Sequence, residues 1–226
     1  MVTNANLHHV IIQGIIDKGY APSIEELSKR LEAEHHEVVE GLYTLQEYHG
    51  VVLHPNEPKI WVIHPFSLAP TNFYVQTEKG AWWGNCAWCS LGVAALVKED
   101  VKITTLIGGE TEQVHIHIVD GEIQEKDYFI HFPISMKKAW DNVIYTCSNM
   151  LLFKNKEQVN TWSERHNIPI GDIQPLEKIW HFSKKWYGNH LDRDWKKWTT
   201  EEAKQLFEAY ELKHEIWNLG DSKERF

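Results

Sequence analysis

The sequence is poor in cysteine, with three in 226 residues. Three thiols are too few for a disulfide framework and odd in number, which favours reduced cysteines and a cytoplasmic protein. No stretch approaches the ~20 consecutive apolar residues of a membrane span, so we expect no membrane partner. The first residues also lack the basic and apolar segments of a secretory signal.

Positive charge is scarce relative to negative charge. The chain has 23 Lys and Arg against 32 Asp and Glu, a formal net charge of −9. Proteins that bind the phosphates of nucleic acids need an excess of positive charge, so the net negative charge argues against a nucleic-acid partner. Gly108-Gly109 lacks the lysine and hydroxyl residue of a phosphate-binding loop. No Gly-x-Ser-x-Gly elbow or His-Glu-x-x-His pair occurs either.

Helix and hairpin signals fill the first part of the chain. An apolar run predicts a helix within the first 20 residues, and Ser23 with Glu26 forms a capping box that starts a second one. A third helix is predicted over about residues 35–48, and residues 51–64 are typical of a hairpin around a proline-containing turn. Three helices and a hairpin in this order predict a winged-helix domain over residues 1–66.

The predicted winged helix does not resemble a DNA reader. Its third helix starts with Glu34-His35-His36-Glu37 and continues with Glu40, so it is acidic where a recognition helix should be basic. We interpret this domain as a packing module that serves the rest of the chain, and a DNA-binding regulator is the last alternative.

Residues 67–226 are predicted to form a second, α+β domain, with residues 65–72 as a linker punctuated by prolines. Short runs joined by tight turns predict an antiparallel sheet, and the patterns after it predict flanking helices. The strands are expected over residues 73–76, 101–107, 114–119 and 128–132, and the helices over residues 156–166, 173–187 and 200–212.

Two of the three cysteines lie in one short stretch, residues 82–92. The small apolar residues that end it predict a buried helix, which puts Cys89 at or near a helix N-terminus, where thiolate is favoured over thiol. Cys86 lies three residues earlier, and Cys147 lies in a second apolar run over residues 143–153. Two such sites predict a dry pocket for a soft electrophile or a soft metal.

The Cys-x-x-Cys pair alone leaves several interpretations open. This spacing occurs in redox couples, in metal sites and in plain packing. A structural zinc site has four ligands, so Cys86, Cys89 and Cys147 would need a histidine as well. The predicted substrate-binding residues are Trp83, Trp88 and Ser90, which lie beside the cysteines in the sequence. The two tryptophans would form the wall of the pocket.

Several segments resemble the organomercurial (alkylmercury) lyases. The resemblance rests on Ala87-Trp88-Cys89-Ser90-Leu91, on the Cys147 segment that ends at Leu152-Phe153, and on the preceding winged helix. It implies that thiolates at Cys89 and Cys147 hold the mercury of R–Hg⁺, while an aspartate takes part in protonating the departing carbon. Further segments are similar to a broader group assigned to that family: His64-Pro65-Phe66-Ser67 with Pro70-Thr71, Trp186-Tyr187-Gly188 and Trp195.

The aspartate that the resemblance implies is missing. Its position, three residues after Cys89, holds Gly92, which can neither donate a proton nor bind a metal. Cys86 is the candidate substitute, because a third thiol could act as the acid or as a third sulfur ligand. Asp141 is a candidate only by its proximity to Cys147 in the sequence. Gly92→Asp is the sharpest probe of this interpretation: a gain in turnover would show that the fold and the thiols are poised for protonolysis and that only the acid is missing.

The resulting hypothesis is an alkylmercury lyase-like enzyme that cleaves a carbon–mercury bond by protonolysis. Thiolates of Cys89 and Cys147 would act on a small organometal, because soft sulfur outcompetes oxygen and nitrogen for mercury. No cofactor is required. Two alternatives remain open: a soft-metal-binding or sensing protein that holds Hg, Cu or Zn through Cys86, Cys89 and Cys147, and a lyase-fold enzyme with another thiol-dependent chemistry on a soft electrophile.

Overall fold

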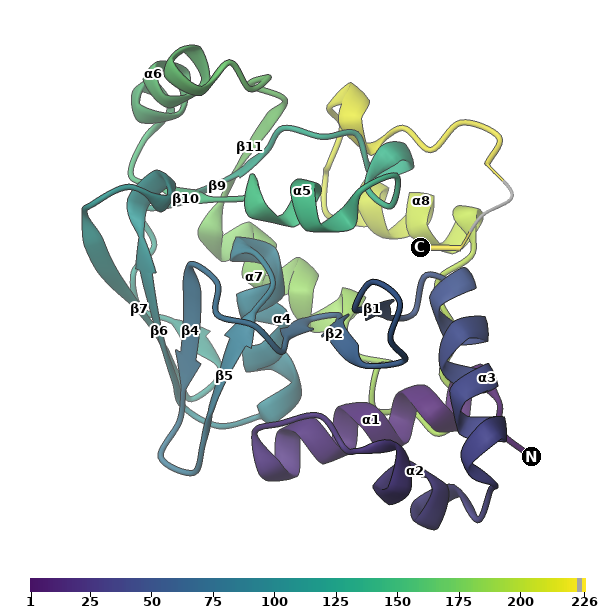
Figure 1. Ribbon diagram of the computed structural model, residues 1–226. Helices are drawn as coiled ribbons and strands as arrows, with labels where there is room; N and C mark the ends of the chain where they lie inside the picture. Colours follow the sequence, from purple (N-terminus) through teal and green to yellow (C-terminus); the bar gives the residue numbers. More distant parts are fainter. Residues whose placement is uncertain (223–224) are drawn as a thin grey trace.

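The computed structural model describes residues 1–222 and 225–226. Three helices open the chain, α1 (Asn4–Lys18), α2 (Ile24–Leu31) and α3 (His35–Glu47), and they lie together at one end of the molecule (Figure 1). Capping boxes at Thr3 and Ser23 start α1 and α2. The three helices expected in this region are therefore confirmed.

An eight-stranded antiparallel sheet follows the three helices. Its strand order is β1-β2-β3-β5-β4-β6-β7-β8, so sequence neighbours mostly pair and only β4 and β5 are exchanged. The strands are β1 (Val52–Leu53), β2 (Ile60–Ile63), β3 (Phe66–Ser67), β4 (Phe73–Gln76), β5 (Ala81–Gly84), β6 (Val101–Leu106), β7 (Gln113–Val119) and β8 (Glu122–Ile123).

A second, three-stranded antiparallel sheet lies apart from the first, with the order β10-β9-β11. The expected strand at residues 128–132 belongs here, as β9 (Phe129–Phe132), between β10 (Leu152–Phe153) and β11 (Asp172–Pro175). The mixture of helices and antiparallel sheet confirms the α+β class. The remaining helices are α4 (Ala87–Val97), α5 (Val143–Ser148), α6 (Lys156–His166), α7 (Leu176–Trp186) and α8 (Thr200–Ala209), with short 3-10 turns at Ile107–Gly109, Met136–Lys138 and Glu215–Trp217.

Two local expectations were wrong. The segment at residues 65–72 is not only a linker, because β3 within it pairs with β2 on one side and β5 on the other. The helix expected from residue 173 starts at Leu176, because Asp172–Pro175 pair with β9 instead. Pairing between distant segments decides both cases, and local propensity does not report it.

The large sheet runs through the predicted domain boundary at residue 66. The β1–β2 hairpin is the edge of this sheet, and β3 joins it to the strands of the C-terminal part. Three helices and a hairpin thus occur in the predicted order, while the winged-helix interpretation and the division into residues 1–66 and 67–226 remain predictions. None of the described helices is both long and apolar enough to cross a membrane.

Helix α4 lies at the centre of the fold, between strands β4 and β5 and helix α7 (Figure 1). Every residue of α4 except Ala95 and Val97 is buried, as expected for a helix that is apolar on all sides. Gly84 permits the close approach of β5, because a Cβ there would lie 2.6 Å from the Cα of Ser90. This placement fixes the first turn of α4, which carries two of the three cysteines.

Trp82 ties the N-terminal helices to the sheet, because its indole N–H donates to the carbonyl of Ile15 at 2.8 Å. We expect Trp82→Phe to lower the free energy of unfolding by about 1 kcal/mol, the usual net value of one buried hydrogen bond. Urea unfolding measures this, with the half-buried Trp83→Phe as the control. Equal losses in the two variants would contradict the role given to this bond.

Candidate active site

Cys86 is the N-cap of α4. Its side chain accepts a hydrogen bond from the backbone N–H of Cys89 at 3.3 Å, as a serine or threonine oxygen would at this position. Cys89 therefore lies in the first turn, where free N–H groups favour a negative charge. The expected helix N-terminus at Cys89 is confirmed, and the structure adds that the other cysteine of the pair is the cap.

Cys147 reaches the same place from α5, which is capped by Asn142. The chain after α5 returns to α4, where the backbone N–H of Ala87 donates to the carbonyl of Met150 at 3.0 Å. The Cys86 thiol also lies 3.8 Å from the sulfur of Met150. These contacts bring two cysteine segments about sixty residues apart in sequence into one site.

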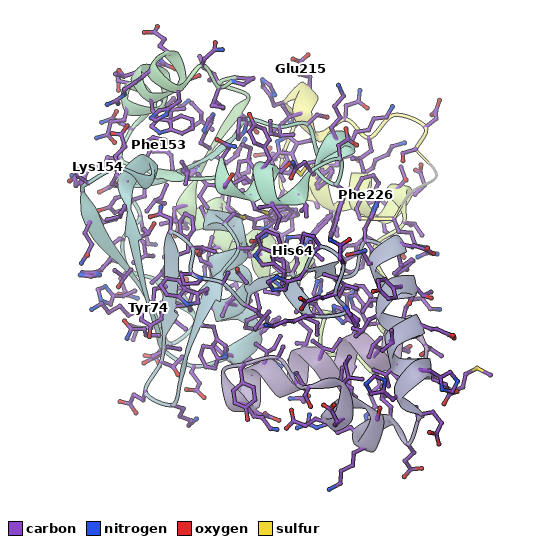
Figure 2. All side chains as sticks on the ribbon, viewed as in Figure 1. His64, Tyr74, Phe153, Lys154, Glu215 and Phe226 are labelled. Atoms are coloured by element: carbon purple, nitrogen blue, oxygen red, sulfur yellow. The ribbon has the colours of Figure 1, made fainter. Side chains whose placement is uncertain are left out.

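His64, from the end of β2, completes the group, and it lies near the middle of the molecule (Figure 2). Its Nε2 lies 3.6 Å from the Sγ of Cys147 and 3.1 Å from the amide nitrogen of Asn85. His64, Cys89 and Cys147 each offer one ligand atom, and these three atoms lie within 4.8 Å of one another. Two thiols and an imidazole thus converge on a single point.

Tyr187 approaches Cys89 from the opposite side, at the C-terminal end of α7. Its hydroxyl lies 3.5 Å from the Sγ of Cys89, and the side chain is buried. Burial and the neighbouring thiol of Cys89 raise the pKa of the Tyr187 hydroxyl well above its usual value, so it keeps its proton and can donate to the sulfur.

The three thiols differ in their acidity. Burial alone would raise the pKa of the Cys89 thiol, but hydrogen bonds from Cys147, Cys86 and Tyr187 outweigh it and hold that pKa well below the usual thiol value. Burial raises the pKa of Cys86, and hydrogen bonds to Cys86 and Cys89 raise that of Cys147. Burial also lowers the pKa of His64, so its imidazole is neutral at pH 7. The position of Cys89 in the first turn of α4 and its hydrogen bonds thus favour its thiolate form over those of Cys86 and Cys147.

We expect one thiolate to titrate well below pH 9 and to be lost only when the pH falls through the lowered pKa of Cys89. Thiolate absorbance near 240 nm measures this titration. Tyr187→Phe removes one donor to the sulfur, so the transition should move to higher pH. Cys89→Ala should remove the transition altogether. An unchanged titration in Tyr187→Phe would show that the tyrosine does not stabilise the thiolate.

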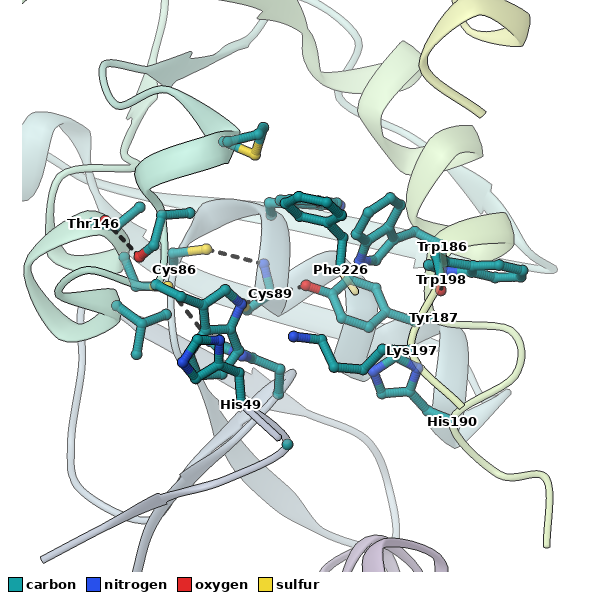
Figure 3. Close-up of a pocket in the computed structure, with 18 of the residues that line it drawn as sticks. His49, Cys86, Cys89, Thr146, Trp186, Tyr187, His190, Lys197, Trp198 and Phe226 are labelled. Carbon is teal, nitrogen blue, oxygen red and sulfur yellow. Dashed lines mark hydrogen bonds between the residues drawn. The ribbon is translucent and has the colours of Figure 1, made fainter. Parts of the chain in front are cut away.

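A cavity of about 100 Å³ opens beside the thiols. Figure 3 shows Cys86 and Cys89 on one side of it and Tyr187, His190 and Lys197 on the other. The ring of Trp140 packs edge-on against His64, with centroids 5.1 Å apart, and the ammonium of Lys197 lies 4.8 Å from the centroid of Trp140. Tryptophan, tyrosine and phenylalanine side chains dominate the wall: Trp88, Trp140, Trp186, Tyr187, Trp195, Trp198, Phe207 and Phe226.

The structure places the predicted site residues in two groups. Cys86, Cys89, Cys147 and Trp88 line the cavity. Trp83 packs instead on the sheet against Tyr74, with ring centroids 4.6 Å apart. Ser90 donates to the carbonyl of Ala87 at 2.7 Å and faces a different, very small cavity under the sheet. The solvent-exposed Asp141 is not among the residues that line the thiol cavity.

Two residues of the site, His64 and Tyr187, did not emerge as site residues from the sequence. Both lie in segments that resemble the broader family group, His64-Pro65-Phe66-Ser67 and Trp186-Tyr187-Gly188, and this was the available signal. His64 is 83 residues from Cys147, and Tyr187 is 98 residues from Cys89. No sequence spacing therefore relates either segment to the cysteines.

Gly92 lies under the ring of Tyr187. A Cβ at this position would lie 2.5 Å from two ring carbons of Tyr187 and 2.9 Å from the Cβ of Pro65. This packing argues against a gain of turnover in Gly92→Asp, because the space for a side chain is already filled. The residue that fills it is the one that contacts the Cys89 sulfur.

The fold and the thiol cluster define a cysteine-based protein whose donor set suits soft metals. A model of the alkylmercury lyase family matches residues 66–188. This match covers more than half of the chain, and the chain belongs to the alkylmercury lyase family. Among solved structures, the mercury-bound form of MerB2 is similar, with 19% identity, a TM-score of 0.66, and coverage of 84% of this chain and 90% of that chain. No curated protein matches the chain.

Proposed function

We propose that the protein cleaves the carbon–mercury bond of small organomercurials by protonolysis, with Cys89 and Cys147 as the thiols that take the metal. The observation that carries this proposal is the approach of the two sulfurs to within 4.8 Å of each other, beside the Nε2 of His64. Membership in the alkylmercury lyase family supports it. The cavity next to the sulfurs, with its largely aromatic wall, supports it as well.

Cys89 takes up the substrate. An organomercurial reaches the protein as R–Hg–SR′, bound to a small thiol, and the Cys89 thiolate displaces that thiol from the mercury. The lowered pKa of Cys89 keeps the attacking sulfur ionised at neutral pH. Sulfur is the softest ligand that a protein offers, so the exchange favours binding at this site.

Cys147 provides the second sulfur and the proton. Because its pKa is raised, its thiol keeps the proton until the substrate is bound. Once its sulfur binds the mercury, the Cys147 thiol is driven to lose this proton, and the Nε2 of His64, 3.6 Å away, accepts it and passes it to the carbon. One S–H and one Hg–C bond break, one C–H and one Hg–S bond form, and R–H leaves. The mercury stays between two sulfurs until excess thiol removes it, and no oxidant or reductant is needed.

The cavity favours small organic groups. Its volume of about 100 Å³ is below the ~150 Å³ of an apolar cavity that holds benzene. Methylmercury and ethylmercury should therefore fit without rearrangement of the tryptophans, whereas phenylmercury should not. We expect the ratio kcat/KM to be higher for methylmercury than for phenylmercury.

The test is a product assay. Full-length protein is incubated with methylmercury or phenylmercury and excess thiol, and methane or benzene is measured by gas chromatography. We expect methane above the level of the thiol-only control, and less benzene at equal substrate. Protein that takes up methylmercury but releases no methane above the control would refute the proposed lyase activity.

A further inference from the structure

We infer that His64, Cys89 and Cys147 form a zinc-binding centre with an open fourth position that faces the aromatic cavity. This centre would hold a divalent metal ion whenever no organomercurial occupies the sulfurs. It goes beyond the proposed reaction and does not depend on it, because it requires only that the three donor atoms bind one ion.

The geometry comes from three separate parts of the fold. His64 follows β2, Cys89 lies in the first turn of α4, and Cys147 lies in α5. Their ligand atoms lie within 4.8 Å of one another, and His64 Nε2 lies 3.6 Å from Cys147 Sγ. Zinc binds sulfur at about 2.3 Å and nitrogen at about 2.0–2.1 Å, so the ligand atoms around one tetrahedral ion lie roughly 3.5–3.8 Å apart. The approach of His64 to Cys147 already has this value, and metal binding would draw any wider pair of the cluster to a similar separation.

The donor set selects the metal. Two thiolates and one imidazole match the Cys₂His set found in catalytic zinc sites, which keep the fourth position for water or substrate. Magnesium and calcium prefer oxygen ligands, and the described residues around the three donors supply no carboxylate to the cluster. Metal binding would exchange the Asn85 contact of His64 Nε2 for the metal.

The open position has room for a ligand. The cavity beside the thiols measures about 100 Å³, and a water molecule takes about 30 Å³ in the liquid. Cys86 is the nearest further thiol, but its sulfur serves as the helix cap and accepts the Cys89 N–H. It is also outside the group of atoms that lie within 4.8 Å of one another among the described residues. We therefore assign three protein ligands and one exchangeable ligand.

A zinc ion here would share both sulfurs with the substrate. Mercury is the softer ion, so an organomercurial should displace zinc from the thiolates. Zinc release on addition of methylmercury is then expected at one ion per chain, and added zinc should slow the uptake of methylmercury. The metal-bound state would also keep the three buried thiols from forming disulfides with each other.

Metal titration tests the site directly. Reduced, metal-free, full-length protein is titrated anaerobically with Co²⁺, and zinc affinity is measured by competition with a chelating dye. We expect one Co²⁺ per chain, with sulfur-to-cobalt charge transfer in the near ultraviolet and strong tetrahedral bands in the visible. No cobalt uptake at one equivalent would overturn the inference.

Four variants test the ligand assignment. His64→Ala, and His64→Gln as a second variant that keeps a polar side chain at this position, should weaken zinc binding by at least about tenfold and change the visible cobalt bands. The matched control is His190→Gln, because His190 lines the same cavity outside the cluster. The three-ligand assignment would be overturned if both His64 variants kept the zinc affinity of the natural sequence. It would also be overturned if Cys86→Ser lost as much zinc affinity as the His64 variants.

The outcome is separable from the proposed function, because hydrocarbon release is measured in the same preparations. Protein that binds zinc through His64 but releases no methane refutes the lyase activity and leaves the zinc centre standing. Protein that releases methane but takes up no cobalt refutes the zinc centre alone.

Discussion

Gly92→Asp should destabilise the protein by more than about 3 kcal/mol and should lower the release of hydrocarbon. The new Cβ would meet the Tyr187 ring at 2.5 Å and Pro65 at 2.9 Å, in a buried part of α4. Overpacking of this kind typically costs about 1–3 kcal/mol, and burial of a carboxylate adds to it. Displacement of Tyr187 would also remove a donor from the Cys89 sulfur.

Gly92→Ala separates the steric part from the charge. Alanine is better than glycine in a helix by about 1 kcal/mol, which offsets part of the clash. The net loss in this variant should therefore be smaller, about 1–2 kcal/mol at most. Urea unfolding gives the stability of each variant, and gas chromatography gives its hydrocarbon release.

A double-mutant cycle identifies the group that excludes the aspartate. Tyr187→Ala removes the ring above position 92, so Gly92→Asp should cost at least about 1 kcal/mol less in the Tyr187→Ala background than in the natural sequence. Additive losses would show that the ring does not limit this position. A gain of turnover in Gly92→Asp alone would contradict the packing argument as a whole.

Cys147→Ala should separate uptake of the organomercurial from cleavage. Cys89 can still take the metal, so stoichiometric binding of methylmercury should remain. Methane release in a single turnover should fall by about 10²–10⁴-fold, the usual contribution of a positioned proton donor, because the thiol that donates through His64 is gone. Free-thiol counting measures uptake, and gas chromatography measures methane.

Cys89→Ala should lose both uptake and release, because it removes the low-pKa thiolate. Ser148→Ala is the matched control for Cys147→Ala, since the exposed Ser148 lies next to it on α5 and its hydroxyl bonds only locally, to Tyr145 and Asn149. Methane release at the natural rate in Cys147→Ala would exclude Cys147 as the proton source. The proton would then have to come from another group of the site, and Cys86 is the first to test.

Local features of the fold could be predicted from the sequence because they depend on neighbouring residues. The capping box of Ser23 and Glu26 involves two side chains three positions apart, and it starts α2 as expected. The uncharged apolar run after Cys89 specifies a buried helix, whatever it packs against. The candidate cysteines were found in the same way, since their rarity and apolar surroundings are properties of the sequence.

The contacts of each face of a strand were harder to predict from the sequence. Trp82 and Trp83 are adjacent in β5 and therefore point to opposite sides of the sheet. Trp83 had been expected beside the cysteines, but it packs against Tyr74, whereas Trp82 bonds to α1. Alternation fixes that the two differ, whereas only the packing of helices on the sheet decides what each one contacts.

The sequence by itself determined the helices of the N-terminal region, the α+β class and the three thiols. The tertiary structure alone decided that His64 and Tyr187 join them and that Gly92 is filled by a ring from α7. The physical reason is that these contacts join backbone segments far apart in the chain, whose meeting depends on the register of β3 and on the packing of α7 against α4. Residue types and spacings specify the chemistry that a segment offers, and the packed core specifies which segments share it.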